Sequence, residues 1–347
     1  MKAAVLRKFN EDLVIENLII PELTEGQVLV DIKFSGICGA QVNQKKGVKI
    51  EEKFLPCLMG HEGSGIVLDI GKNVSKVKTG DHVVLHWRKS SGIDSEFPKY
   101  FSETSNENIG AGLVTTFSEK SIISENRLTK IDKEHPLDIA SLLGCGVTTG
   151  IGIINNELSV SPQDSYVVAG VGGVGLSAVL GASLNSPSIV IALDLNDKKL
   201  KFANEIGSTH QINIEKEKNF VKTINEITEN VGVNYAIDTT GNAKIIDNLL
   251  DIIKPGGSLV LVGQPQENED LVISNFLKLY KGINILDSQG GLANPEEEIP
   301  KLLNLYKKNQ LNLDLLISKK ISLDEINNGF DILENHSLVG SRIVIEN

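Results

Sequence analysis

Three residues that can bind a transition metal stand at glycine-rich turns far apart in the sequence. Cys38 lies in SGICG, His61 in GHEGSG and Cys145 in LLGCGVTTG. Two thiolates and one imidazole form a three-ligand tetrahedral zinc site with an open fourth position, which catalysis by zinc requires. Taken singly, each residue is more often a packed cysteine or a hydrogen-bonded histidine. Only the three together therefore predict a metal.

A glycine run further along the chain has the pattern that binds the pyrophosphate of a dinucleotide. The run follows the strand-like segment YVVA, opens a helical pattern and consists of Gly170, Val171, Gly172, Gly173, Val174 and Gly175. Its glycines permit a tight turn and a close approach of the backbone to a phosphate at a helix N-terminus. A glycine-rich turn without a ligand fits the pattern alone, but the flanking strand and helix favour a dinucleotide site.

Asp194 ends the next strand-like segment, 19 residues beyond Gly175. A carboxylate there can accept hydrogen bonds from both hydroxyls of an adenosine ribose and repels a 2′-phosphate. The residues that follow, Leu195 to Lys199, include no arginine that could pair with such a phosphate. The sequence therefore predicts NAD rather than NADP.

The elements expected around the three metal candidates are short strands. Residues 27–34 (QVLVDIKF) alternate apolar and polar side chains, and residues 63–70 and 82–85 lie between glycine turns. Such spacing favours an irregular barrel or sandwich. Residues 89–112 are polar and rich in glycine and serine, and predict a long loop.

From about residue 146 strands alternate with helices, which predicts a doubly wound α/β domain with a parallel sheet. The expected strands are 165–169, 188–194, 234–239, 258–263 and 283–286, and the expected helices are 173–184, 197–206, 217–229 and 243–253. Beyond residue 295 we expect helices near 297–307 and 323–334 and a last strand at 342–345. The domains are then 1–145, completed by 289–347, and 146–288.

Composition narrows the class of protein. The 347 residues carry a formal net charge of −11, which disfavours binding to nucleic acid or to an anionic membrane surface. The sequence contains no run of about 18 uncharged apolar residues, the length needed to cross a membrane. The first residues, MKAAVLR, reach a charge too early for a signal peptide. Three cysteines are too few for a disulfide framework and fit a reducing compartment. We therefore expect a cytoplasmic protein.

The order and spacing of these motifs resemble the zinc-containing alcohol dehydrogenases of the medium-chain dehydrogenase/reductase family. The resemblance runs nearly end to end, through GQVLV, SGICG, GHEGSGIV, GDHVV, GCGVTTG, the glycine run and KPGGSLVLVG. It implies a GroES-like β-rich catalytic domain interrupted by a Rossmann NAD domain. It also implies a homodimer or homotetramer in which edge strands pair, with 283–286 as a contributor.

The resemblance also implies roles for single residues. Catalytic zinc lies on Cys38, His61 and Cys145, and Glu62 is a nearby carboxylate that can exchange onto the metal. Contacts with NAD come from Thr149 at the nicotinamide, Lys199 at the adenosine ribose, the backbone of Val262 and Gly263, and Arg342 at the pyrophosphate. For Lys199 and Arg342 a solvated surface charge is an equal alternative.

The implied reaction transfers a hydride between an alcohol and NAD. Zinc lowers the pKa of the alcohol, so that an alkoxide forms near neutral pH and expels hydride to the nicotinamide. In the reverse direction zinc polarises a carbonyl group, and the substrate is a small alcohol or carbonyl compound.

Two residues in the segment that follows Cys38, Ala40 and Gln41, depart from the pattern of the family. Ala40 stands where serine or threonine usually relays the alcohol proton, and alanine has no proton to relay. Gln41 stands where a carboxylate would often steady the metal-bound histidine, and its amide supplies no charge. Candidates for a substitute relay are Asn43, His86 and Thr148.

A second, structural zinc is not expected. Many relatives carry a four-cysteine lobe after the GDHVV-like strand, whereas residues 89–112 contain no cysteine. We expect one zinc ion per chain, and we interpret Cys57 as a packed apolar residue.

The segment after GDHVV could contact the substrate. His86, Trp87, Arg88 and Lys89 place two cations beside an aromatic ring, which favours a phosphate, carboxylate or sulfonate on the substrate, such as a phosphorylated sugar, or else a polyol. An ordinary solvated basic turn is the alternative.

Two other functions remain open at this point. A zinc-independent quinone or enone reductase shares the fold but has no need of two thiols and a histidine at these turns. A non-catalytic NAD-binding protein that keeps zinc as a structural element gains some support from Ala40. Metal removal separates them, because an enzyme loses turnover whereas a structural zinc protein loses its fold.

Overall fold

The computed structural model describes residues 1–48, 51–265, 269–335 and 337–347, and the chain forms two compact units. Unit 1 consists of Met1–Gly146, Asn294–Leu338 and Arg342–Asn347, and unit 2 of Val147–Ala293 with Val339–Ser341. The sequence placed the changes of domain at 145/146 and 288/289, and in the structure the chain changes units at 146/147 and 293/294.

Unit 1 contains a small closed barrel of short strands. Its order is β1 (Lys2–Leu6), β2 (Val14–Ile19), β7 (Lys99–Ser102), β8 (Glu107–Gly110) and β4 (Cys57–Leu58). Apolar side chains that alternate along these strands, among them Val5, Leu18 and Ile109, pack together inside it. The β-rich character predicted for this region is confirmed.

The prediction of one long loop over residues 89–112 is wrong in its second half. β7 and β8 form an antiparallel pair there, and Tyr100 is fully buried in the barrel core. The Tyr100 hydroxyl accepts a hydrogen bond from the Ile122 N–H at 2.7 Å. Only alternate residues of the pair are buried, so the polar composition of the exposed residues hid the strands.

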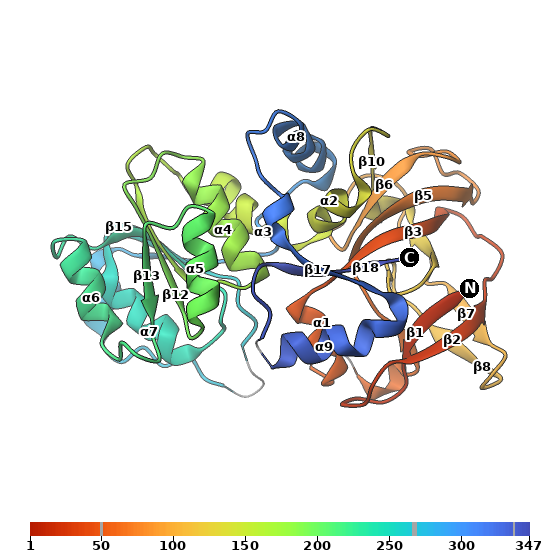
Figure 1. Cartoon of the computed structure of the whole chain (residues 1–347), viewed down its shortest axis with the longest axis horizontal. Coiled ribbons are helices and arrows are strands. Elements are labelled where there is room, and N and C mark those ends of the chain that lie inside the picture. The colour runs from red at the N-terminus through yellow and green to blue at the C-terminus, as the bar shows by residue number, and fades with distance from the viewer. Residues whose placement is uncertain (49–50, 266–268, 336) are drawn as a thin grey trace. The chain divides into compact units, whose positions relative to one another are not determined.

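A second sheet of unit 1 joins the two ends of the chain. Its order is β10 (Leu128–Ile131), β6 (His82–His86), β5 (Glu62–Ile70), β3 (Gln27–Ile37), β18 (Arg342–Glu346) and β17 (Ile317–Ser322), and β9 (Lys120–Ser124) also pairs with β3. β18 runs antiparallel to β3 with Ile343 opposite Ile37. Figure 1 shows this blue C-terminal strand beside the red and orange N-terminal ones.

Helices of unit 1 close its core. They are α1 (Gly39–Lys45), α2 (Leu137–Ser141), α8 (Pro295–Lys307) and α9 (Ile326–Glu334), with the short turns η1 (Glu52–Phe54), η2 (Glu125–Arg127), η3 (Leu142–Gly144), η6 (Asp314–Leu316) and η7 (Leu323–Glu325). On α9, Phe330 packs edge-on against Phe117 with ring centroids 6.1 Å apart. The C-terminal helix is therefore anchored in the core of unit 1 by an aromatic pair.

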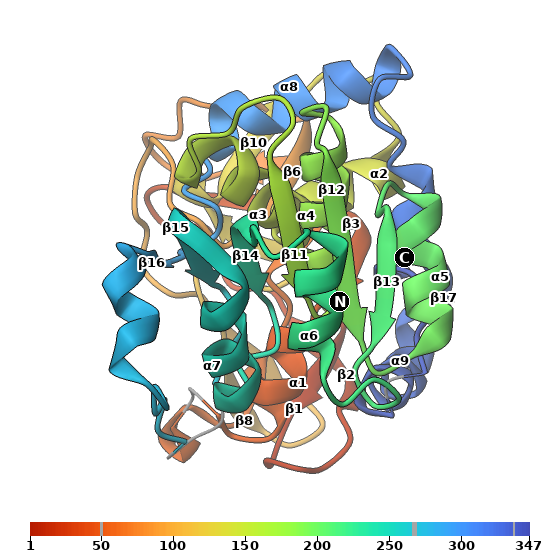
Figure 2. The same cartoon turned by 90° about the vertical axis from the view of Figure 1, so that its left-hand side faces the viewer.

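Unit 2 is built on a six-stranded parallel sheet. Its order is β13 (His210–Asn213), β12 (Ile189–Asp194), β11 (Ser165–Ala169), β14 (Val233–Asp238), β15 (Ile253–Leu261) and β16 (Asn284–Asp287), and every pairing is parallel. Figure 2 shows these strands side by side. The predicted doubly wound domain is confirmed. The sequence missed β13, a four-residue strand in which only Ile212 is buried.

Helices cover both faces of the parallel sheet. α4 (Gly173–Ser183) and α5 (Asp197–Glu205) lie along one face, and α6 (Phe220–Ile227) and α7 (Ala243–Ile252) along the other (Figures 1 and 2). The remaining elements are α3 (Gly146–Gly152), η4 (Ile153–Glu157) and η5 (Phe276–Lys281). Strand order reverses at β11, with β12 on one side and β14 on the other. Ligands of such sheets bind at the carboxyl ends of the strands at this switch point.

Within the described ranges, no single helix combines the length and the apolar composition needed to cross a membrane. One bent pair, Leu137–Gly144 with Gly146–Glu157, meets that criterion only when its two helices are taken together.

Candidate functional site

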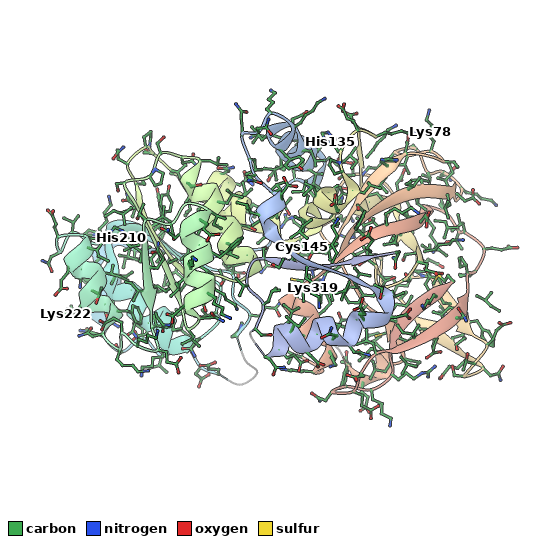
Figure 3. The ribbon with its side chains drawn as sticks, in the orientation of Figure 1. Lys78, His135, Cys145, His210, Lys222 and Lys319 are labelled. Atoms are coloured by element: carbon green, nitrogen blue, oxygen red, sulfur yellow. The ribbon has the colours of Figure 1, made fainter. Side chains whose placement is uncertain are left out.

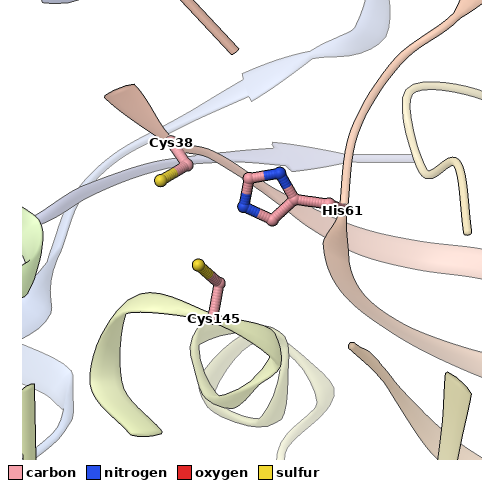
Figure 4. Close-up of side chains that lie close together, drawn as sticks. All are labelled: Cys38, His61 and Cys145. Carbon is pink, nitrogen blue, oxygen red and sulfur yellow. The ribbon is translucent and has the colours of Figure 1, made fainter. Parts of the chain in front are cut away.

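The two thiols and the imidazole predicted as metal ligands come together in unit 1. Cys38 precedes α1, His61 precedes β5, and Cys145 lies between η3 and α3. One ligand atom of each lies within 4.8 Å of the others. In Figure 4 both sulfur atoms and one ring nitrogen point toward a common space, and Figure 3 labels Cys145 within unit 1. Zinc bound tetrahedrally to such atoms needs them about 3.4–3.8 Å apart, and separations of no more than 4.8 Å are compatible with such a site.

The cluster stabilises one sulfur as a thiolate. A hydrogen bond from Cys145 and the charge of Arg342 outweigh burial and lower the pKa of Cys38 well below its ordinary value. The hydrogen bond to Cys38, together with burial, raises the pKa of Cys145. Burial alone would lower the pKa of His61, but the Cys38 thiolate raises it. The site thus attracts a cation, which would release the remaining thiol proton.

One atom of the cluster has an unmet bonding capacity. Nε2 of His61 is buried, and within the part of the chain that the structure describes it has no hydrogen-bond partner. A buried polar atom without a partner costs free energy unless a ligand satisfies it. A buried imidazole nitrogen that faces two sulfur atoms therefore fits a zinc ion, once it gives up any proton it carries.

Glu62 and Arg342 form a buried ion pair beside the cluster. Arg342 Nε donates to Glu62 Oε1 at 2.7 Å, and its Nη2 lies 3.6 Å from Cys38 Sγ. Burial raises the pKa of Glu62, although the Arg342 charge opposes this. Arg342 is 4% exposed, so the alternative of a solvated surface charge is wrong for this residue. Its contact with a pyrophosphate stays a prediction.

Two glycines, Gly36 and Gly146, leave the space that the side chains of this ion pair occupy. A Cβ at Gly36 would overlap the Glu62 carboxylate, and one at Gly146 would overlap the Arg342 guanidinium. The glycines that flank Cys38 and Cys145 in the sequence therefore permit close packing of charged groups, in addition to forming turns.

Gln41 contacts both Cys38 and His61. Its Oε1 accepts a hydrogen bond from the Cys38 N–H at 3.0 Å, and its Nε2 faces His61 Nδ1. Gln41 is 1% exposed, whereas Ala40 next to it is partly exposed in the first turn of α1. The side chain at residue 41 therefore has the place of a group that orients the metal-binding histidine.

The glycine run of unit 2 lies at the switch point of the sheet. Gly170 follows β11 with φ of +83°, and Gly172 is the N-cap residue of α4. A Cβ at Gly172 would meet nothing within 4 Å, whereas one at Gly175 would overlap the Gly170 carbonyl. The run thus leaves open space at a helix N-terminus, and α4 begins at Gly173 and Val174 without a side-chain cap.

Asp194 ends β12 beside this turn. Its Oδ2 accepts a hydrogen bond from the Val171 N–H and its Oδ1 one from the Asn196 N–H, both at 3.0 Å. The carboxylate is therefore held at the edge of the glycine turn. Lys199 lies partly exposed on α5.

The turn after β14 also belongs to this region, and the sequence reading missed it. The Thr239 hydroxyl donates to the Gly170 carbonyl at 2.7 Å. The N–H groups of Val262 and Gly263 both donate to the Asp238 carbonyl. The segment DTTG (238–241) was the available signal, since it begins within the last residues of the predicted strand 234–239 and ends in glycine.

The remaining candidate residues are buried or partly buried. Thr148 and Thr149 are buried on α3 in unit 2, and Asn43 is partly buried on α1 in unit 1. Cys57 is buried in unit 1, and burial raises its pKa to about 11, as for a packed thiol.

The basic segment after β6 divides into residues of different character. His86 is buried, and its Nδ1 and Nε2 lie 2.8 Å from the Arg88 carbonyl and 3.0 Å from the Thr129 hydroxyl. Burial lowers the pKa of His86 to about 4. His86 is therefore a neutral residue of the interior, and its roles as a substrate contact and as a relay stay predictions.

Trp87 and Arg88 remain available to a ligand. Trp87 is 37% exposed, and the Arg88 guanidinium lies 5.8 Å from its ring centroid. Arg88 Nε is buried without a hydrogen-bond partner among the described residues. Lys89, in contrast, pairs with Asp94 at 3.0 Å, so its charge is offset.

A second group of possible metal ligands lies at the surface of unit 1. Asp132, Glu134 and His135 bring ligand atoms within 4.8 Å of one another. The Lys307 ammonium pairs with Glu134 at 2.5 Å and already supplies a positive charge there.

Two family descriptions match successive parts of the chain. Residues 24–133 match the alcohol dehydrogenase GroES-like domain, and residues 173–308 match the zinc-binding dehydrogenase domain. The first match lies within unit 1, and the second lies mostly within unit 2.

Similar proteins match nearly the whole length of the chain. An alcohol dehydrogenase 6 of Peromyscus maniculatus is 31% identical over 96% of this chain and 95% of its own length. An S-(hydroxymethyl)glutathione dehydrogenase of Paracoccus denitrificans is 29% identical over 96% of both chains. The crystal structure of benzyl alcohol dehydrogenase from Acinetobacter calcoaceticus has 30% identity and a TM-score of 0.86 over 99% of this chain and 98% of its own.

Proposed function

Because this chain belongs to the zinc-containing alcohol dehydrogenases of the medium-chain dehydrogenase/reductase family, we propose that Cys38, His61 and Cys145 hold its catalytic zinc. The protein is an oxidoreductase that transfers a hydride between an alcohol and NAD with the help of zinc. The observation that carries the assignment to these residues is the buried His61 Nε2, which has no hydrogen-bond partner among the residues that the structure describes and lies beside the two thiols.

Bound zinc supplies a Lewis acid that lowers the pKa of an alcohol hydroxyl and polarises a carbonyl group. The chain's own residues prepare the site for it. Cys38 carries the negative charge, and Arg342 holds Glu62 beside the ligands. We propose Glu62 as the carboxylate that can exchange onto the metal. Ala40 has no hydroxyl, so the alcohol proton leaves through water or another side chain.

NAD is assigned to the switch point of unit 2. Gly172 and Gly173 would present the N–H groups at the start of α4 to a pyrophosphate, and Asp194 its carboxylate to the adenosine ribose. Further contacts are proposed for Gly170, Val174, Gly175, Thr149, Lys199, Val262, Gly263 and Arg342.

The substrate is proposed to be an alcohol or carbonyl compound that carries an anionic group. The register of β5 and β6 pairs Glu62 with His86, so His61 and Trp87 lie at the same end of that strand pair. Arg88 beside Trp87 has no acidic partner among the described residues, which supports recognition of a carboxylate or phosphate. Lys89 is paired and is assigned no part.

The two alternative functions, a metal-free reductase and a non-catalytic NAD-binding zinc protein, explain the same observations less well. A metal-free quinone or enone reductase gives no reason for a buried imidazole nitrogen that faces two thiols. A non-catalytic NAD-binding zinc protein is consistent with Ala40, but not with relatives that are named as dehydrogenases over their whole length.

The assembly, the location and the number of metal ions are part of the proposal. β16 is an edge strand of its sheet, and Ile285 on it is 41% exposed. Phe276 and Tyr280 on the preceding η5 are 72% and 80% exposed. Such an apolar edge supports pairing with a second copy into a dimer or tetramer. We assign one zinc ion per chain and a cytoplasmic location.

Elemental analysis combined with NADH and NADPH assays on a panel of alcohols and aldehydes tests this function. We expect about one zinc ion per chain, and turnover with NADH that a chelator or Cys145→Ser abolishes, with the fold retained by circular dichroism. Zinc-free protein that still turned over would refute the metal mechanism. Loss of the fold on chelation would instead favour the structural zinc protein.

A further inference from the structure

We propose that the side-chain amide of Gln41 must rotate by about half a turn, exchanging its oxygen and nitrogen, when zinc binds. As a consequence, this chain binds zinc less tightly than the same site would with a carboxylate at residue 41. The inference rests on the proposed zinc function. It concerns a positioning residue, because Gln41 acts on the metal through His61.

The hydrogen bonds of Gln41 fix the direction of its amide in the metal-free chain. Oε1 accepts from the Cys38 N–H at 3.0 Å, which leaves Nε2 against His61 Nδ1. An amide NH₂ group only donates, so Nδ1 of His61 must accept. The ring proton of the neutral imidazole then sits on Nε2, the buried atom that faces the cysteines.

Zinc reverses this requirement. A metal binds the lone pair of Nε2, so the ring proton must move to Nδ1, and Nδ1 becomes a donor. Two donors, the Cys38 N–H and the His61 Nδ1–H, then face opposite ends of one amide that has a single oxygen. With 1% of Gln41 exposed, water cannot readily supply the missing acceptor.

The amide can satisfy one donor but not both. If it turns, Oε1 accepts from His61 and the Cys38 N–H loses its hydrogen bond at the N-terminus of α1. If it does not turn, the NH₂ group is pressed against the Nδ1–H. A carboxylate of the same length has two acceptor oxygens and satisfies both donors at once. Glutamine at residue 41 therefore couples zinc binding to the loss of the hydrogen bond from the Cys38 N–H at the start of α1.

Zinc affinity of the full chain, measured by competition with a chelator, tests the inference. We expect Gln41→Glu to bind zinc at least about 10-fold more tightly than the wild type, because partners of ligand histidines typically change affinity by about 10–100-fold. Gln41→Met, which has no amide, should bind more weakly than the wild type. The matched control is Gln44→Glu on the same helix, which adds the same charge at a side chain that makes no hydrogen bond to His61 in the described structure and should leave the affinity within about twofold.

Hydrogen exchange at the backbone N–H of Cys38 reports the rotation of the Gln41 amide without relying on enzymatic activity. We expect zinc to accelerate exchange at this amide in the wild type and to leave it unchanged in Gln41→Glu. Equal zinc affinities of wild type and Gln41→Glu, or a Cys38 amide equally protected with and without zinc, would overturn the inference alone. A wild-type chain that binds no zinc would overturn the proposed function instead.

Discussion

The Arg342 guanidinium donates to the Glu62 carboxylate at 2.7 Å in a pair whose side chains are 5% and 0% exposed. Arg342 begins β18 and Glu62 begins β5, and both strands pair with β3 between them. The carboxylate and the guanidinium therefore meet across β3, where Gly36 offers no side chain. This pair links the C-terminal strand to the strand that follows His61, the proposed zinc ligand.

Removal of the arginine should destabilise unit 1 strongly. In Arg342→Gln the Glu62 carboxylate is left buried without its cation, and we expect a loss of about 3–5 kcal/mol in the free energy of unfolding. The measurement is denaturant unfolding of the metal-free chain. The double variant Glu62→Gln with Arg342→Gln should recover most of the loss, because no buried charge remains. Two losses that simply add would show that the pair is not coupled.

Replacement of Asp194 should weaken the preference for NAD. In Asp194→Ser the ribose loses a charged acceptor, and we expect kcat/KM with NAD to fall about 10–100-fold while turnover with NADP rises. The matched control is Asp197→Ser on α5, since Asp197 pairs with Lys216 rather than with the glycine turn. An unchanged ratio of NAD to NADP turnover in Asp194→Ser would remove the assigned role.

Much of unit 2 could be predicted because each of its elements carries a local signal. β11 is a five-residue apolar run followed by a positive-φ glycine, and the structure bounds it at the predicted residues, Ser165 and Ala169. β13 escaped because its four residues include only one buried side chain. The pair β7 and β8 escaped for a similar reason, since its polar positions outnumber its buried ones.

The arrangement around the metal cluster could be predicted only in part. Residue types and glycine spacing identified Cys38, His61 and Cys145 as possible ligands, and the structure brings the three together. The burial of Arg342 against Glu62 depends on a strand pairing between the two ends of the chain, which no local pattern encodes. The hydrogen bond between His86 and Thr129 escaped for the same reason, because Thr129 lies on another strand.

Acid should remove a stabilising contribution of Glu125. This carboxylate is 1% exposed and accepts hydrogen bonds from the N–H groups of Ser75, Lys76 and Ile93 at 2.6–2.9 Å. Burial raises the pKa of Glu125, but these bonds outweigh burial and lower it. A lowered folded-state pKa means that the contribution is complete above the ordinary value of about 4.3 and is lost as the pH falls through the folded value.

Thermal unfolding at several pH values tests this contribution. We expect Glu125→Gln to be less stable than the wild type by about 1–3 kcal/mol at pH 7, because the amide retains only one acceptor oxygen. The difference should begin to shrink below about pH 4.3, where the carboxylate of the unfolded chain takes up its proton, and it should disappear as the pH falls through the lowered pKa of the folded state. The exposed Glu103→Gln is the control and should show no such trend. A difference that did not depend on pH would contradict the assignment.

Arg88 and Lys89 should differ in their effect on substrate binding. Arg88 stacks beside the exposed Trp87 without an acidic partner among the described residues, whereas Lys89 is neutralised by Asp94. For an alcohol that carries a carboxylate or phosphate, we expect Arg88→Gln to raise KM about 10-fold or more, since a charge-assisted hydrogen bond contributes about 1.5–3 kcal/mol. Lys89→Gln, the matched control, should leave KM almost unchanged.

An uncharged alcohol of similar size separates charge recognition from a distorted site. Its KM should be the same in the wild type and in Arg88→Gln, because the neutral variant keeps a side chain beside the Trp87 ring. If Arg88→Gln raised KM equally for both alcohols, the change would report lost packing at Trp87. If it raised KM for neither, the anionic substrate would be refuted and the segment would be an ordinary basic turn.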